Sequence, residues 1–284
     1  MKVRNRSTAA SRRAVFVERA WVGTCAPYGV ISKGQPAEYS TVDFPQPASS
    51  ESHRPRYAPR VTETGLGTEP RSTHQALADE RNATVEIWIN GEFLPRDEAK
   101  VSVFDSGFLV GDGVWEGLRL HHGRFAFLGR HLDRLFAGLA ATGINVGMTR
   151  DEVADALRAT VAHNEMHDDV HVRLMVTRGD KKTPSQHPSN CVGGPNVVII
   201  AEHKAADPSV LESGISLFTA TVRRPPPDTL DQRLNCHSKL HEVIALIQAV
   251  EAGADEALML DPTGAAATCN ATNFFVVREG GVWT

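Results

Sequence analysis

The sequence of 284 residues has few cysteines and no long apolar run. Because no stretch of about 18 consecutive apolar residues occurs, no membrane-spanning helix is predicted. The four cysteines are widely spaced without a Cys-x-x-Cys pair, which favours a reduced, cytoplasmic compartment over a disulfide framework. The glycine-rich dinucleotide fingerprint, the Walker loop and the Gly-x-Ser-x-Gly nucleophile motif are also absent, which excludes the commonest signatures of nucleotide binding and of serine hydrolysis.

Charge is unevenly distributed along the chain. The formal net charge is −4, but residues 1–82 carry 12 basic and 8 acidic side chains, whereas the remainder carries 18 basic and 26 acidic ones. An acidic body argues against nucleic-acid binding as a general property.

The first 82 residues do not have the pattern of a folded unit. They are rich in Pro, Ser, Thr and Arg and show neither a helical nor a strand period, so we expect a disordered N-terminal extension. The first 17 residues are basic and contain no acid, a weak likeness to a transit peptide, although a solvated tail is the favoured interpretation.

Regular structure is predicted from residue 83 onward. Residues 85–90 alternate between apolar and polar, as a half-buried strand does, and Asn90-Gly91 is a hairpin turn signal. The pattern predicts a helix over residues 129–142 and a second helix started by a capping box of Thr149 and Glu152. Further elements are expected as follows: a glycine-punctuated loop at 106–112, buried strands at 170–177, 196–203 and 214–224, a helix after Ser238, and strands at 256–261 and 273–277.

Lys239 is the strongest candidate for a catalytic lysine. Ser238 is a good N-cap for the following helix, whose expected core face carries Leu240, Val243, Ile244, Ile247 and Val250. This arrangement places Lys239 in the first helical turn, where the positive end of the helix dipole favours a neutral amine. A neutral amine is what a Schiff-base lysine needs, but a surface lysine at a helix start is the competing interpretation.

Other polar residues also have two interpretations. His237 and His241 are spaced to share a helix face and could form half of a metal site, but no third ligand is evident and packed histidines are favoured. Arg134 lies on the polar side of its helix and either pairs with an acid or offers its guanidinium to a phosphate. Arg178, at the end of a buried strand, either binds an anion or makes a structural ion pair.

Several segments together resemble the class IV, pyridoxal-phosphate-dependent aminotransferases, a family that includes branched-chain aminotransferases, D-amino-acid aminotransferases and aminodeoxychorismate lyases. The likeness runs from about residue 88 to the last residue. It is carried by residues 88–93 (WINGEF), 104–108 (FDSGF), 111–116 (GDGVWE), 131–135 (HLDRL), 172–179 (VRLMVTRG) and 251–261 (EAGADEALMLD).

The resemblance implies an α+β or α/β fold of two domains, like that of D-amino-acid aminotransferase. A small α/β domain is expected at residues 83–205, a strand and proline-rich connector at 206–228, and the start of a large pseudo-barrel domain at 229–284. The implied reaction is transamination between an amino acid, branched-chain-like, and a 2-oxo acid by a homodimer that binds pyridoxal 5′-phosphate. The implied cofactor ligands are Arg134, Thr268, Thr272 and Asn273, and the implied substrate contacts are Trp115 and Arg178.

Three departures from the family pattern stand out. Counted back from Gly253, the usual lysine position holds Asn235, and we expect Lys239 to replace it from one helical turn away, about 6 Å along the same face. The family's glutamate that partners the pyridine nitrogen is replaced by Thr268. The chain also ends before the family's later Gly-Ile-Thr loop, so we expect an incomplete large domain. The alternatives are a D-amino-acid aminotransferase, an aminodeoxychorismate-lyase-like enzyme, or a non-catalytic homologue.

Overall fold

The computed structural model of the protein describes residues 78–205 and 208–284. Most of the expected N-terminal extension therefore lies outside the described residues. None of the described helices is both long and apolar enough to cross a membrane.

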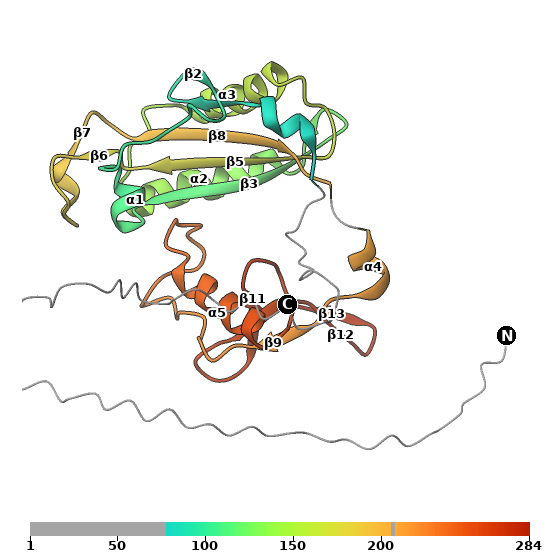
Figure 1. Cartoon of the computed structure of the whole chain (residues 1–284). Helices are drawn as coiled ribbons and strands as arrows, with labels where there is room; N and C mark the ends of the chain where they lie inside the picture. Colours follow the sequence, from blue (N-terminus) through green and yellow to red (C-terminus); the bar gives the residue numbers. More distant parts are fainter. Residues whose placement is uncertain (1–77, 206–207) are drawn as a thin grey trace, which may run out of the picture. The chain divides into compact units, whose positions relative to one another are not determined.

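A six-stranded antiparallel sheet forms the first part of the described chain, with strand order β2-β1-β8-β5-β3-β4 (Figure 1). Its strands are β1 (Glu86–Ile89), β2 (Glu92–Pro95), β3 (Gly113–His121), β4 (Arg124–Phe125), β5 (Val170–Thr177) and β8 (Asn196–His203). The predicted hairpin at Asn90-Gly91 joins β1 to β2, and the two strands predicted as buried, β5 and β8, have the predicted bounds.

Two helices cover one face of this sheet, α2 (Leu128–Thr142) and α3 (Arg150–His163), and both lie behind it in Figure 1. Their apolar sides pack on alternate residues of the strands, so Leu118, Leu174 and Ile199 are almost fully buried. The capping box of Thr149 and Glu152 is confirmed, since each side chain accepts a hydrogen bond from the backbone N–H of the other.

The short elements around the sheet are η1 (Glu80–Thr84), α1 (Ser106–Val110), η2 (Pro188–Asn190) and the two-stranded ribbon of β6 (Asp180–Lys181) and β7 (Cys191–Val192). The prediction of a loop over residues 106–112 was wrong in its first half. The Asp105 side chain accepts hydrogen bonds from the backbone N–H groups of Gly107 and Phe108, and this capping closes one helical turn, α1.

A second sheet has the strand order β11-β10-β9, and α5 packs on it. The remaining elements are α4 (Ser209–Ser213), β9 (Leu217–Thr219), α5 (Leu240–Glu251), β10 (Glu256–Leu260), β11 (Ala266–Cys269) and the hairpin of β12 (Val276–Arg278) and β13 (Gly281–Trp283). The predicted strand over residues 214–224 is only three residues long, and the one predicted from residue 273 begins at Val276.

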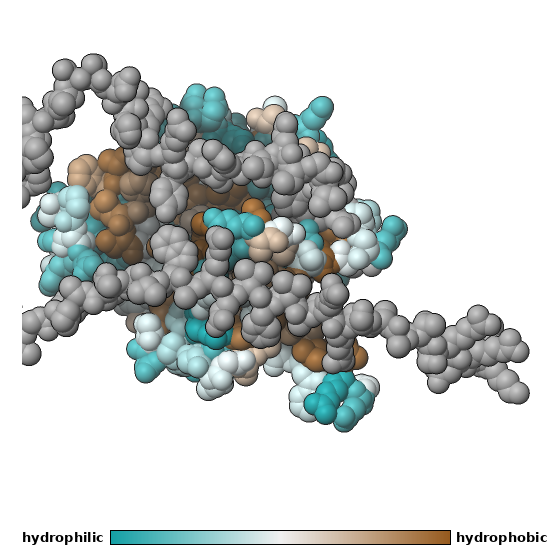
Figure 2. Space-filling view, turned by 60° about the horizontal axis from the view of Figure 1, so that its bottom comes forward, coloured by the Kyte–Doolittle hydropathy of each residue, from teal (hydrophilic) through white to brown (hydrophobic). Residues whose placement is uncertain are grey.

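The start and the buried face of α5 differ from the prediction. Lys239, and not Ser238, is the N-cap residue, and it makes no side-chain capping bond. The residues of α5 that are fully buried are the small ones, Ala245 and Ala249, whereas Leu240 is 71% exposed and Ile247 49% exposed. The expected core stripe thus lies at the surface of this chain. Exposed apolar side chains also occur among polar ones on the face of the molecule drawn in Figure 2.

Candidate active site

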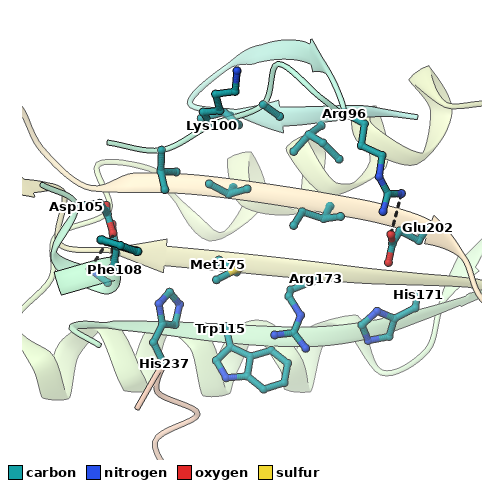
Figure 3. Close-up of a pocket in the computed structure, with 18 of the residues that line it drawn as sticks. Arg96, Lys100, Asp105, Phe108, Trp115, His171, Arg173, Met175, Glu202 and His237 are labelled. Atoms are coloured by element: carbon teal, nitrogen blue, oxygen red, sulfur yellow. Dashed lines mark hydrogen bonds and ion pairs between the residues drawn. The ribbon is translucent and has the colours of Figure 1, made fainter. Parts of the chain in front are cut away.

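A cavity of about 780 Å³ lies on the face of the six-stranded sheet that the helices leave uncovered (Figure 3). Side chains alternate along a strand, so the residues between the core positions of β3, β5 and β8 point into it. Its lining includes Ile87, Ile89, Arg96, Trp115, His171, Arg173, Met175, Val198, Ile200, Glu202, Lys204, His237 and Lys239.

Arg173 occupies the middle of this lining, between Trp115 and His171 (Figure 3). Its guanidinium carbon lies 4.2 Å from the centre of the Trp115 ring, a cation–π contact. No acceptor among the described residues hydrogen-bonds to this guanidinium, and burial lowers the pKa of Arg173 from its ordinary value. A desolvated cation without a hydrogen-bonded partner favours the binding of an anion.

A second desolvated cation, Lys204, lines the cavity directly after the end of β8. Burial lowers the pKa of Lys204; Glu202 opposes this shift, whereas the charges of Arg119 and Arg173 add to it. Glu202 is itself paired with Arg96, with 3.1 Å between Oε1 and Nη1. The polar lining is therefore richer in cations than in carboxylates.

His237 lies at the opposite end, beside Asp105 (Figure 3). Its backbone N–H donates to the Gly113 carbonyl at 3.0 Å, and its ring packs so closely on Gly113 that a Cβ there would lie 3.0 Å from the ring. Burial lowers the pKa of His237, and Nε2 is buried without a hydrogen-bond partner in the described structure. His237 is thus a neutral ring with one uncommitted nitrogen.

Lys239 lines the same cavity from the start of α5. Its Nζ lies 3.4 Å from Glu242 Oε1, and this carboxylate also faces Arg224 at 3.6 Å and His241 at 3.7 Å. Because its side chain is 29% exposed, the amine is accessible to a ligand in the cavity. His237 and His241 do not belong to any group of three potential metal ligands among the described residues.

The expectation that Asn235 and Lys239 share a helix face was wrong, because α5 begins only at Leu240. Residues 235–237 instead run beside β3: the Asn235 carbonyl accepts from the backbone N–H of Trp115 at 2.8 Å, and Cys236 forms an isolated bridge with Val114. The Trp115 indole N–H donates to the Cys236 carbonyl at 3.2 Å. This segment therefore connects the predicted lysine to the predicted substrate contact, Trp115.

Arg134 lies in a different cavity, of about 600 Å³, together with Asn273. Its guanidinium forms a fork on Glu116, with Nε–Oε1 at 2.7 Å and Nη2–Oε2 at 2.6 Å, and His131 lies 2.8 Å from the same carboxylate. Glu116 is buried and Arg134 is half exposed, so the carboxylate orients the arginine while one side of it stays open. Two predicted cofactor ligands, 139 positions apart in sequence, thus meet here.

Thr268 and Thr272 line neither of these cavities. The Thr268 hydroxyl donates to the Thr272 carbonyl at 3.0 Å, and the Thr272 hydroxyl donates to the fully buried Glu256 at 2.9 Å. These bonds hold the loop that leads to Asn273.

Arg178 makes a structural ion pair, which was one of the two interpretations that the sequence left open. Its guanidinium donates two hydrogen bonds to the Asp112 carboxylate, from Nε to Oδ2 at 2.6 Å and from Nη2 to Oδ1 at 3.0 Å. It also donates to the backbone carbonyls of Thr142 and Gly143. The guanidinium thereby ties the end of β5 to the end of α2, and it does not line the main cavity.

The cavity face of β5 is the part of the site that sequence reasoning missed. Interpreting residues 170–177 as one buried strand hid the alternation of apolar residues with His171, Arg173, Met175 and Thr177. A period of two is the signal of a sheet covered on one face only, and it would have singled out Arg173.

The chain is similar to known proteins over most of the part that the structure describes. The family model "Amino-transferase class IV" matches residues 113–284. Branched-chain-amino-acid aminotransferase-like protein 1 of Arabidopsis thaliana is 42% identical over 205 residues, 72% of this chain and 36% of that protein. The putative branched-chain-amino-acid aminotransferase of Methanocaldococcus jannaschii is 38% identical over 69% of this chain and 66% of its own length.

Solved structures show the same fold. The T.th. branched-chain amino acid aminotransferase with pyridoxamine 5′-phosphate has a TM-score of 0.64 at 26% identity, covering 70% of this chain and 67% of its own. The chain thus spans about a third of the plant relative and about two thirds of the archaeal one. The matches confirm the predicted family and the predicted α+β two-domain class, and the chain belongs to the class IV aminotransferases.

Proposed function

We propose that this protein catalyses pyridoxal-phosphate-dependent transamination between an amino acid with a branched, apolar side chain and a 2-oxo acid. The observation that carries the proposal is the main cavity, which holds an accessible amine, Lys239, and a guanidinium, Arg173, that has no hydrogen-bonded partner in residues 78–205 and 208–284. Transamination needs both groups, because both substrates carry a carboxylate and the chemistry passes through a lysine.

The residues that would hold the cofactor are chemically suitable for it, and they line two cavities, Lys239 one and Arg134 with Asn273 the other. Arg134, half exposed and oriented by Glu116, and the Asn273 amide face one cavity and are suitable ligands for a phosphate. Lys239 would supply the amine that holds the cofactor covalently, and Thr268, in the place of the family's glutamate, would have to release the Thr272 carbonyl before its hydroxyl could contact the cofactor. When bound, pyridoxal phosphate acts as an electron sink that acidifies the α-carbon of the amino acid.

Substrate binding is assigned to the sheet face. Arg173 binds the carboxylate of the incoming amino acid or 2-oxo acid, and Trp115 holds the guanidinium in place from one side. The apolar wall of Ile87, Met175, Val198 and Ile200 suits an aliphatic side chain and offers no partner for a polar one. Arg178 can contact the substrate only after its two hydrogen bonds to Asp112 break, and we propose it as a substrate contact on that condition.

Lys239 also moves the proton. A neutral Nζ would accept the proton that leaves the α-carbon of the amino acid and would later donate it back. Glu242, 3.4 Å from Nζ, holds the amine toward the cavity between these steps. Homodimeric assembly and a cytoplasmic location belong to the same proposal, and sedimentation and cell fractionation test them.

Borohydride reduction of the purified protein with added pyridoxal phosphate tests the lysine assignment. We expect the protein to show the absorbance band of covalently bound pyridoxal phosphate. After reduction, peptide mapping should find the cofactor attached to Lys239. Lys239→Ala should lose the adduct, whereas Lys204→Ala, a control lysine in the same cavity, should keep it. An adduct that persists in Lys239→Ala would disprove the assignment.

The choice of amino donor needs a separate assay. D-alanine aminotransferase of Listeria monocytogenes is 28% identical over 70% of this chain, and 4-amino-4-deoxychorismate lyase of Pseudomonas aeruginosa has a TM-score of 0.56 at 27% identity. A panel of L- and D-amino acids scored by 2-oxo acid formation should show highest kcat/KM for branched L-donors. Activity confined to D-donors, or none at all with cofactor bound, would point to the alternative enzymes or to a non-catalytic homologue.

A further inference from the structure

A buried lysine and a cysteine face each other on the β6–β7 ribbon, and neither lines the two cavities described above. Lys181 and Cys191 are directly opposite partners in the antiparallel register, so their side chains lie on the same face of the ribbon. Lys181 is only 3% exposed, and its backbone N–H donates to the Phe104 carbonyl, which anchors the strand. Cys191 is a free cysteine and remains partly exposed.

The partner of the Lys181 amine is unusual. Nζ lies 3.6 Å from Cys191 Sγ, and no carboxylate lies within ion-pair distance of it among the described residues. A buried ammonium is costly unless an anion compensates its charge, and the nearest group able to become an anion is this thiol. The charge of Arg178 also acts on Cys191, although the guanidinium itself is committed to Asp112.

We propose that Cys191 is a peroxide-reactive thiol that Lys181 activates, and thus a site of oxidation to sulfenic acid. The Lys181 amine lies 3.6 Å from the sulfur, so its positive charge faces the negative charge that develops on sulfur when the thiol reacts as a nucleophile. The sulfur attacks one oxygen of hydrogen peroxide, so that an S–O bond forms and the O–O bond breaks. Sulfur loses two electrons, the peroxide is reduced, and the proton from the thiol ends on the leaving oxygen, giving Cys191 sulfenic acid and one water.

The other described cysteines lack this setting and serve as internal references. Cys236 is 9% exposed and Cys269 5% exposed, and no cationic side chain hydrogen-bonds to either sulfur in the described structure. Burial raises the pKa of the Cys269 thiol, which keeps it protonated and unreactive. A single peroxide-sensitive position is therefore expected among the three.

Timed labelling of sulfenic acid with dimedone, followed by peptide mass spectrometry, tests the proposal on the full chain. With stoichiometric hydrogen peroxide at pH 7, Cys191 should be labelled roughly tenfold faster than in Lys181→Met, which keeps an unbranched side chain only one atom shorter and removes the charge. Lys182→Met is the matched control, because Lys182 is the next residue and is exposed; its rate should equal that of the unchanged protein.

Two outcomes would overturn the proposal. One is an equal labelling rate at Cys191 in Lys181→Met, and the other is faster labelling at Cys236 or Cys269 than at Cys191. Should Lys181→Met not fold, the unchanged protein is compared with a synthetic peptide of residues 185–197. A Cys191 rate in the protein that does not exceed the peptide rate rejects activation by the fold.

Discussion

Arg173 stacks on Trp115 at 4.2 Å across the open face of the sheet and has no hydrogen-bond acceptor among the described residues. The contact supports the cation from one side through the π-face of the indole and leaves the N–H donors directed to the cavity. Such an arrangement contributes little to the stability of the free protein, since burial desolvates the guanidinium and the charge of Glu202 offsets this only in part. The cavity therefore offers a carboxylate a binding position next to Arg173.

Arg173→Met should separate binding from folding. We expect KM for the amino acid to rise by about 10- to 100-fold, which corresponds to the loss of one charge-assisted hydrogen bond, with a smaller change in kcat. The free energy of unfolding should stay equal or increase. Steady-state kinetics and urea titration measure the two effects, and Arg124→Met, at an exposed arginine, is the control. An unchanged KM would remove Arg173 from the substrate site.

Glu116→Gln should destabilise the protein by about 2 kcal/mol, since it removes the charge that pairs with Arg134 and His131 from a buried position. Urea unfolding measures this change. The variant should also bind cofactor more weakly, because Arg134 loses the group that orients it. Asp133→Asn, which alters the exposed ion pair between Asp133 of α2 and Arg150 of α3, should change stability by less than about 1 kcal/mol.

Gly113→Ala and Gly129→Ala should have opposite effects on stability. A Cβ on Gly113 would lie 2.6 Å from the Val176 carbonyl oxygen and 3.0 Å from the His237 ring, so the strand or the ring must move, at a cost of about 1–3 kcal/mol. Gly129 lies within α2 and has room for a Cβ, so alanine should stabilise by roughly 0.5–1 kcal/mol. Thermal unfolding compares them, and the same sign for both would contradict the described packing.

Acidification should destabilise the protein partly through His237. Burial lowers its pKa in the folded state; Asp105 and Asp112 oppose this shift, and Arg173 adds to it. Below the pKa of about 6.5 that histidine has in the unfolded chain, the unfolded state binds a proton that the folded ring does not. The contribution of His237 to the free energy of unfolding is therefore complete above about pH 7.5 and declines below about pH 6.5. His237→Gln should flatten the fall between pH 6.5 and 5.5 by up to about 1.4 kcal/mol per pH unit, measured by urea titration; an identical pH profile would exclude His237 as a cause.

The two faces of α5 should respond differently to substitution. Ala249→Leu should destabilise by about 1–3 kcal/mol, because Ala249 is fully buried against the second sheet. Ile247→Gln should change the stability of the isolated chain by less than about 0.5 kcal/mol, because Ile247 is half exposed. Urea titration at low protein concentration distinguishes them. A large loss for Ile247→Gln would show that the apolar stripe is covered after all.

The sequence alone determined the features that depend on neighbours along the chain. The bounds of β5 and β8, the capping box at Thr149 and the turn at Asn90-Gly91 follow from local patterns, because each involves residues a few positions apart. Six segments in order also determined the family, since their combined spacing is far more specific than any one motif.

Only the tertiary structure decided what the polar residues contact. Arg178 has the same local pattern whether it binds an anion or pairs with Asp112, 66 positions away, and the fold decided for the ion pair. Arg173 became a site residue because the helices cover one face of the sheet and leave the other open. The start of α5 at Leu240 likewise depended on the pairing of Cys236 with Val114, since backbone bonded across to a strand cannot also form a helix.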